Sequence, residues 1–114
     1  MPKYLVARLD ETPGVPCPCG TARRAFRVPE NTTASVHLVE ISEDARPHYH
    51  KRQTEIYVII EGEGHVELDG RLEPVRPLAA IMIRPGCRHR AVGKMKILNG
   101  VIPPFDTADE FFDP

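Results

Sequence analysis

Three histidines and one glutamate carry the clearest chemical signal in the sequence. His48 and His50 are separated by one residue, and Glu55 follows after a short polar connection. In a β-strand, residues i and i+2 project from the same face, so these two imidazoles can point at one position. His89 comes after a Pro85-Gly86 turn and begins another β-type segment. Three imidazoles and a carboxylate can hold a divalent first-row metal and leave coordination positions open for a substrate.

The elements that must position these residues are short β-strands. Segments rich in branched or alternating residues cover 35–41, 55–60, 65–68, 72–75, 79–83, 87–92 and 95–102, and Gly or Pro residues bound them. Asp69-Gly70 supplies a two-residue hairpin turn. Twelve prolines exclude a bundle of long helices, because proline is not tolerated in a helix interior. The pattern predicts an all-β protein, an antiparallel sandwich or barrel.

The two ends of the chain give weaker signals. Residues 4–9 are compatible with a first strand, and residues 21–28 with another. Between them, residues 12–20 contain three prolines and two glycines, which predicts a loop. Near the other end, Thr107 and Glu110 have the spacing of a capping box, which predicts one helical turn.

Composition narrows the classes of function. The chain has 114 residues, the size of one domain, and its 15 Lys+Arg and 16 Asp+Glu give a net charge of −1. This balance argues against nucleic acid or a membrane as partner, and no apolar run approaches the ~20 residues of a membrane span. The start lacks the apolar segment of a signal peptide, so we expect a cytoplasmic protein. The odd set Cys17, Cys19 and Cys87 argues against a disulfide framework.

Two motifs resemble those of the cupin superfamily. The pattern His48-x-His50-x-x-x-x-Glu55, closed by Gly62, is similar to the first cupin motif, and Pro85-Gly86-x-x-His89 resembles the core of the second. The resemblance spans 35–102 and is strongest to small single-domain, conserved-barrel cupins of the mannose-6-phosphate isomerase-like group; residues 103–110 also resemble the ends of these proteins. The second motif departs from the family at Ala79, at the shortened Pro85-Gly86 turn and at Gly93, none of which is a ligand.

The resemblance implies a jelly-roll β-barrel of two antiparallel sheets with a short C-terminal helical turn, and a homodimer. It also implies one divalent transition metal per chain (Fe, Mn, Ni, Zn or Co), held by His48, His50, Glu55 and His89. We expect residues 1–33 to form an N-terminal strand and a Pro/Gly-rich loop that pack on the barrel or on a dimer partner. Residues 34–104 then form the barrel, and residues 105–114 a tail.

Several residues near the motifs have two readings. Tyr57 shares a face with Glu55, so it can contact a metal ligand or the substrate, or simply pack in the barrel. Arg84 and Arg88, with Arg90, are candidate anion clamps at the barrel mouth. Cys87 shares the face of His89, either as a soft ligand or redox-sensitive thiol or as a small buried residue.

The region before the barrel poses similar alternatives. Cys17-Pro18-Cys19 suggests zinc, but the chain has no second cysteine pair to complete a site, so the choice is a site shared across a dimer or a plain loop. The arginines in 23–27 surround Phe26 and can recognise a phosphate or carboxylate, or be ordinary solvated side chains. His37 and His65 are expected to be ordinary sheet residues.

The functional hypothesis is a metal-dependent enzyme acting on a small molecule by isomerase-, lyase- or dioxygenase-type chemistry. One alternative is a barrel that binds a sugar or organic acid without turnover. Another is a metal-free barrel in which the histidines form a hydrogen-bonded cluster. The sequence identifies no general base, so no catalytic residue is assigned, and neither the metal nor the substrate follows from it.

Overall fold

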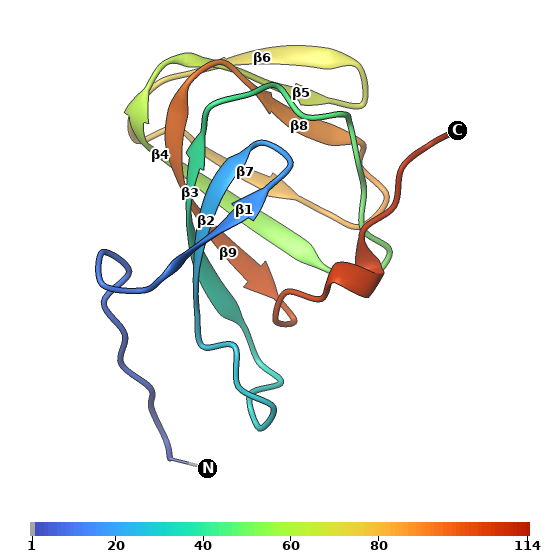
Figure 1. The fold of residues 1–114 in the computed structure, drawn as a ribbon. Helices are drawn as coiled ribbons and strands as arrows, with labels where there is room; N and C mark the ends of the chain where they lie inside the picture. The colour runs from blue at the N-terminus through green and yellow to red at the C-terminus, as the bar shows by residue number, and fades with distance from the viewer. Residues whose placement is uncertain (1) are drawn as a thin grey trace.

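Short antiparallel strands make up nearly all of the regular structure (Figure 1). A computed structural model describes residues 2–114, and every statement on structure below refers to these. The strands are β1 (Gly14–Cys17), β2 (Gly20–Ala25), β3 (Ser35–Ile41), β4 (Thr54–Gly62), β5 (Gly64–Leu68), β6 (Arg71–Val75), β7 (Ala80–Ile83), β8 (His89–Val92) and β9 (Met95–Ile102). In this part of the chain no helix is long and apolar enough to cross a membrane.

The strands form two sheets. One has six strands in the order β1-β2-β3-β9-β4-β7, and the other has three in the order β6-β5-β8. All named pairings are antiparallel. The last strand, β9, lies between β3 and β4, so the chain returns to the centre of the larger sheet. The predicted all-β antiparallel fold is therefore confirmed.

The N-terminal part differs from the sequence-based expectation in two places. Residues 4–9 form no strand, and Tyr4 is 77% exposed, because this segment finds no sheet partner. The predicted loop over 12–20 contains β1, which pairs with β2 as a tight hairpin. Pro16 is tolerated there because β1 is an edge strand, where a missing N–H breaks no ladder. The weak strand over 21–28 is β2, and it ends before Phe26, whose φ is +68°.

At the other end of the chain the predicted helical turn is confirmed. It is a 3-10 turn over Thr107–Asp109, but its cap is Asp106 and not the expected Thr107. The Asp106 side chain accepts a hydrogen bond from the Ala108 amide at 2.9 Å. β1 and β2 belong to the same sheet as β3. The expected division of the chain at residues 33 and 104 stays a prediction.

The core lies between the two sheets and follows strand alternation. Glu55, Tyr57 and Ile59 point inward from β4, and Ile97, Asn99 and Val101 point inward from β9. Tyr57, Ile59 and Ile97 from these rows pack with Val66 and Ala91 from the smaller sheet. Toward one end of the larger sheet the inner rows become polar, and this change marks the site.

Replacing Ile59, which is completely buried, with Ala removes the central apolar contact between the sheets. We expect a loss of about 2–5 kcal/mol in the free energy of unfolding, measured by urea titration. Leu72→Ala on β6, an exposed position, is the matched control and should change stability by less than about 0.5 kcal/mol. Equal effects at both positions would contradict the assignment of the core.

Candidate metal centre and pocket

The four expected ligand residues come together from three parts of the chain. His48 and His50 lie in the connection between β3 and β4, Glu55 is the second residue of β4, and His89 is the first of β8. An isolated antiparallel bridge joins His48 to His89. Their backbones exchange two hydrogen bonds, of 3.1 and 2.8 Å, which fix the connection against the smaller sheet.

The side chains of these four residues converge on one point. One potential ligand atom from each lies within 4.8 Å of the others. Donors bound to one metal at about 2.0–2.2 Å lie at most about 4.4 Å apart, so the cluster is close to ligating geometry. Glu55 Oε1 lies 2.6 Å from His50 Nε2 and 3.0 Å from His89 Nε2. Glu55 and His50 are each 4% exposed and His89 is completely buried.

The second ring nitrogens show how the imidazoles are oriented. His50 Nδ1 lies 2.6 Å from the Asp109 carbonyl oxygen, and His89 Nδ1 lies 2.9 Å from that of Cys87. A carbonyl oxygen can only accept, so both Nδ1 atoms carry the proton. His89 Nε2 makes a hydrogen bond with Glu55 Oε1 at 3.0 Å. His50 Nε2, by contrast, is buried and makes no hydrogen bond, although it lies 2.6 Å from the same oxygen.

The electrostatics of the cluster favour a cation. Burial by itself raises the pKa of Glu55, but the facing imidazoles of His50 and His89 outweigh it and hold this pKa well below its usual range. Burial also lowers the pKa of His50, yet the Glu55 carboxylate reverses the effect and raises it. For His48, burial lowers the pKa to about 4, which leaves its imidazole neutral at pH 7. A neutral imidazole is the form that binds metals.

Two residues that the sequence analysis missed hold the candidate ligands in place. The Asp109 carboxylate accepts hydrogen bonds from the backbone amides of Lys51, Arg52 and Gln53, at 2.9, 3.0 and 2.9 Å. It therefore fixes the loop between His50 and β4. Asn99 donates from Nδ2 to Glu55 Oε2 and so orients the carboxylate. Neither contact has a local sequence signal, because each joins residues more than 40 positions apart.

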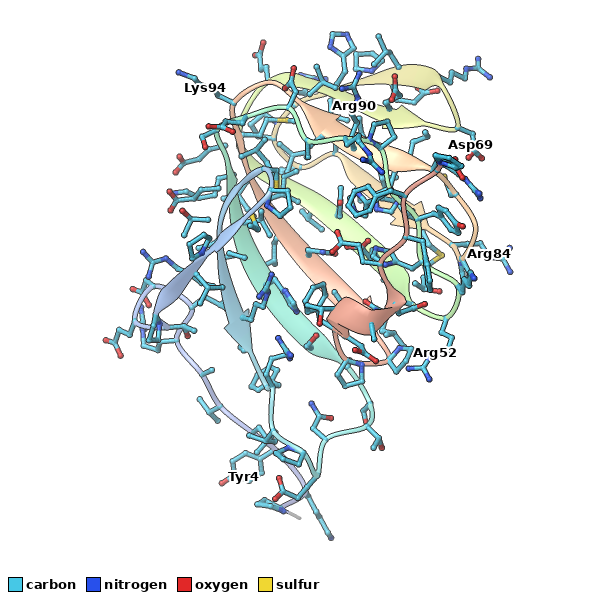
Figure 2. The ribbon with its side chains drawn as sticks, turned by 45° about the vertical axis from the view of Figure 1, so that its right-hand side comes forward. Tyr4, Arg52, Asp69, Arg84, Arg90 and Lys94 are labelled. Atoms are coloured by element: carbon cyan, nitrogen blue, oxygen red, sulfur yellow. The ribbon has the colours of Figure 1, made fainter. Side chains whose placement is uncertain are left out.

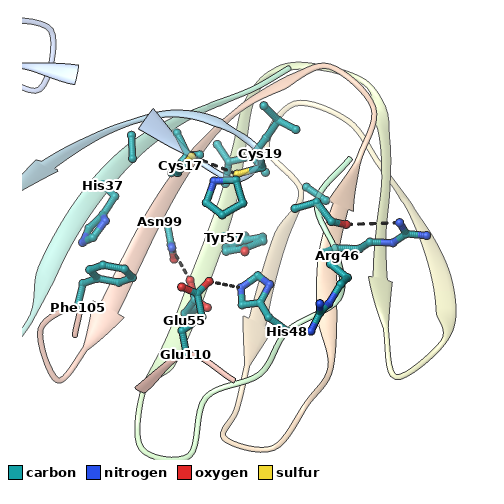
Figure 3. Close-up of a pocket in the computed structure, with 18 of the residues that line it drawn as sticks. Cys17, Cys19, His37, Arg46, His48, Glu55, Tyr57, Asn99, Phe105 and Glu110 are labelled. Carbon is teal, nitrogen blue, oxygen red and sulfur yellow. Dashed lines mark hydrogen bonds and ion pairs between the residues drawn. The ribbon is translucent and has the colours of Figure 1, made fainter. Parts of the chain in front are cut away.

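A pocket opens beside the cluster, between the larger sheet, the N-terminal hairpin and the tail 105–114 (Figure 3). His48 and Glu55 line it together with Tyr57, which is buried. Burial raises the pKa of Tyr57, so its phenol stays protonated and can donate a hydrogen bond. The tail contributes Phe105, Glu110 and Phe112, and the remaining wall is largely apolar.

His37 also lines this pocket, although the sequence analysis expected it to be an ordinary sheet residue. It is a buried β3 residue whose Nε2 lies 2.8 Å from Ser35 Oγ, and its ring meets Phe105 edge-on. Burial lowers the pKa of His37 to about 4, so it is neutral at pH 7. The sequence does contain one signal for this position. His37 alternates in step with Val39 and Ile41, and residues two apart in a strand lie on the same face, here the inner one.

Two of the three candidate anion clamps lie outside the pocket, since Arg84 and Arg88 do not line it. The Arg88 guanidinium donates to the Asp113 carboxylate at 2.9 and 3.0 Å and lies over the Tyr49 ring, where it anchors the tail. Arg90 does reach the lining, and its charge is paired with Glu67 at 3.0 Å. Substrate contacts by Arg84 and Arg88 stay a prediction.

The cysteines are free thiols at the edges of the site. Cys17 and Cys19 line the pocket with their sulfur atoms 3.3 Å apart. The hydrogen bond with Cys19 lowers the pKa of Cys17 to about 6. Within residues 2–114 they join no cluster of three potential metal ligands. Cys87 is partly buried against the core and lies outside the pocket.

Comparison with known proteins identifies the family. Residues 35–96 match the family described as Cupin domain, which is more than half of the chain. The chain therefore belongs to the cupin family, and its two antiparallel sheets are the cupin fold. The search of curated proteins found no match.

Solved structures support the same assignment. A protein from Planctomyces limnophilus is 45% identical, with a TM-score of 0.87 over 98% of this chain and 97% of that chain. The nucleoside dehydratase Pac13 of Streptomyces is 19% identical, with a TM-score of 0.83 over 96% of this chain and 90% of that one. Ectoine synthase from P. lautus is 19% identical, with a TM-score of 0.76 over 95% and 88%. The last two similarities concern the fold alone.

The Asp109 carboxylate offers a test of how the ligand loop is held. Asp109→Ala leaves three amides without their acceptor, and we expect it to lower the free energy of unfolding by about 1–3 kcal/mol. Asp113→Ala breaks only an exposed ion pair with Arg88 and should cost less than about 1 kcal/mol. Urea unfolding of both variants measures the difference. If Asp109→Ala is no more destabilising than Asp113→Ala, the carboxylate does not support the loop.

Proposed function

We propose that this chain binds one divalent transition metal (Fe, Mn, Ni, Zn or Co) through His48, His50, Glu55 and His89. The observation that carries the proposal is the buried His50 Nε2, which faces Glu55 without a hydrogen bond while Nδ1 holds the ring proton. A buried polar atom without a partner is costly, and a cation between Nε2 and the carboxylate would satisfy both. Three nitrogens and one oxygen suit several first-row metals, so the donor set does not select one.

We further propose that the metal serves chemistry on a small molecule in the adjacent pocket. A bound metal with open positions polarises a substrate oxygen or lowers the pKa of bound water. The chain's own residues would orient the substrate: Tyr57 donates a hydrogen bond, Asn99 keeps Glu55 directed at the metal position, and Phe105 and Phe112 restrict water. Isomerase-, lyase- and dioxygenase-type reactions are all compatible with this arrangement.

Two similar folds support an enzyme over a passive barrel, since their names describe a nucleoside dehydratase and ectoine synthase. At 19% identity they do not assign the reaction. Membership of the mannose-6-phosphate isomerase-like group stays a prediction. The alternative, a barrel that binds a sugar or organic acid without turnover, has one observation in its favour. Neither His37 nor Tyr57 has a pKa near 7, where general acid–base catalysis is most efficient.

The metal proposal predicts a defined stoichiometry. Protein purified without an affinity tag should contain about one transition metal per chain by elemental analysis, because the complete donor set belongs to one chain. The variants His50→Ala and Glu55→Ala should lose it and keep the β-sheet circular dichroism spectrum. His65→Ala, which removes an exposed histidine on β5, should retain the metal.

The result that would contradict the proposal is full metal occupancy in His50→Ala or Glu55→Ala. Absence of metal from the wild-type protein after incubation with each of the five divalent ions would contradict it as well. Metal affinity should also fall as the pH is lowered, because protons compete for the same lone pairs.

We infer that a second copy of the chain covers the outer face of the larger sheet. Two apolar rows cross this face by register, formed by Leu38, Leu98, Val58 and Ala80 and by Val36, Gly100, Ile56 and Met82. Contiguous apolar patches of this kind are uncommon on monomers, and a two-fold axis lets one patch pair with itself.

Met82, 63% exposed, tests the proposed homodimer. Met82→Lys places a charge on the outer face and should convert the dimer to a monomer in analytical ultracentrifugation, with the fold unchanged. Leu72→Lys on β6 is the control and should remain dimeric. A monomeric wild-type protein at micromolar concentration would rule out this interface.

A further inference from the structure

A row of polar side chains crosses the inner face of the larger sheet. Residues directly opposite in antiparallel strands share a face, and the register pairs Arg24 with His37, His37 with Asn99, and Asn99 with Tyr57. All four line the pocket. The next inner row, Ala22, Val39, Ile97 and Ile59, is entirely apolar. The polar row therefore runs from the N-terminal hairpin through Asn99, which orients Glu55, to Tyr57.

Arg24 ends this row with a guanidinium that no carboxylate in the described part of the chain contacts, although the Cys17 and Glu110 side chains interact with its charge at longer range. Within residues 2–114 its guanidinium makes no ion pair and no hydrogen bond, and its Nε atom is buried without a partner. Its Cζ atom lies 4.4 Å from the centre of the Phe105 ring, which fixes the planar group against the pocket wall. The neighbouring Arg23 differs, since it donates to the Thr12 carbonyl at 2.6 Å.

The other charged groups of the pocket differ in their partners. Glu55 faces the imidazoles of His50 and His89, and Arg90 is paired with Glu67 at 3.0 Å. Glu110 lies 3.7 Å from His48 Nε2, but that imidazole is neutral at pH 7 and does not neutralise the carboxylate. Arg46 makes no ion pair with a carboxylate in residues 2–114 and lies over Phe112 with Cζ 4.4 Å from the ring centre. Arg24 and Arg46 thus lie over two of the three phenylalanines of the tail, and both offer N–H donors at the pocket, although Arg46 also donates to the Asp113 carbonyl at 3.4 Å.

We propose that the pocket selects a small organic oxyanion whose carboxylate or phosphate pairs with Arg24 while its polar end reaches the His48–Glu55 side. This substrate class rests on the proposed function for its metal-facing end and makes an uncharged sugar a poor ligand. A planar guanidinium binds either oxyanion through two parallel N–H donors. Two strand spacings, about 9–10 Å, separate Arg24 from Asn99, so the ligand needs an extended body of several carbon atoms.

A purely structural role for Arg24, as packing for Phe105, makes a different prediction. Under that role, substitutions of Arg24 would change stability and leave the preference for charged over uncharged ligands unchanged. Arg27 supplies the matched control, because it also lies over Phe105, at 5.3 Å, but is exposed and does not line the pocket.

The test is calorimetric titration of the full chain with three linear six-carbon probes: gluconate, sorbitol 6-phosphate and uncharged sorbitol. We expect at least one anion to bind the wild-type protein about tenfold or more tightly than sorbitol. The stronger of the two identifies carboxylate or phosphate as the recognised group. Arg24→Gln should reduce the preference to about threefold or less, and Arg27→Gln should retain it. Arg24→Lys keeps the charge but loses the planar guanidinium with its parallel donors. Its preference for the anion should therefore lie between those of the two Gln variants.

The inference is overturned if neither anion binds more tightly than sorbitol, or if Arg24→Gln keeps the full preference. It is also overturned if Arg27→Gln lowers the preference as much as Arg24→Gln does. Elemental analysis of the same samples separates this outcome from failure of the metal proposal. A metal-loaded protein without anion preference refutes only the substrate class, whereas a metal-free protein that prefers the anions refutes only the metal.

Discussion

The Glu55 carboxylate is almost completely buried and lies 2.6 and 3.0 Å from two imidazole nitrogens, so its charge must be balanced inside the protein. An uncompensated buried ion costs several kcal/mol, which is a large share of the stability of a domain of this size. The imidazoles balance it only if a proton or a metal cation is held at their Nε2 atoms. Because the Nδ1 atoms of His50 and His89 are hydrogen-bonded to backbone carbonyls, the Nε2 atoms stay beside the carboxylate.

The rest of the fold maintains this arrangement. β4 carries Glu55, β8 begins with His89, and the backbone bridge from His48 to His89 fastens the β3–β4 connection to the smaller sheet. Arg52, on the same connection, projects from the surface (Figure 2). The tail 105–114 closes over that connection through Asp109. Two further contacts hold the tail: Arg46 lies over the Phe112 ring, and Arg88 forms an ion pair with Asp113. One side of the pocket is therefore built from the end of the chain, far from the motif in sequence.

Much of the fold, and the group of four side chains that converge at the site, could be predicted from the sequence. Glycine and proline mark the strand ends, and one-residue spacing puts His48 and His50 on a shared face, so local patterns suffice there. The strand β1 was missed because its proline is harmless only on an edge, and edge position is a property of the whole sheet. His37, Asn99 and Asp109 were missed because register and tail packing bring them to the site. The arginines in 23–27 could not be told apart from the sequence. Arg24 is the one that faces the pocket because of its position in the alternation of β2.

The central claim is that the His48, His50, Glu55 and His89 side chains bind one metal ion. The most direct test is a crystal structure of the metal-incubated protein with anomalous diffraction recorded on both sides of the metal absorption edge. We predict one anomalous peak per chain at the convergence of the four side chains, with bonds of about 2.0–2.2 Å to three nitrogens and a Glu55 oxygen. A peak at any other position, or no peak at this one, would contradict the account.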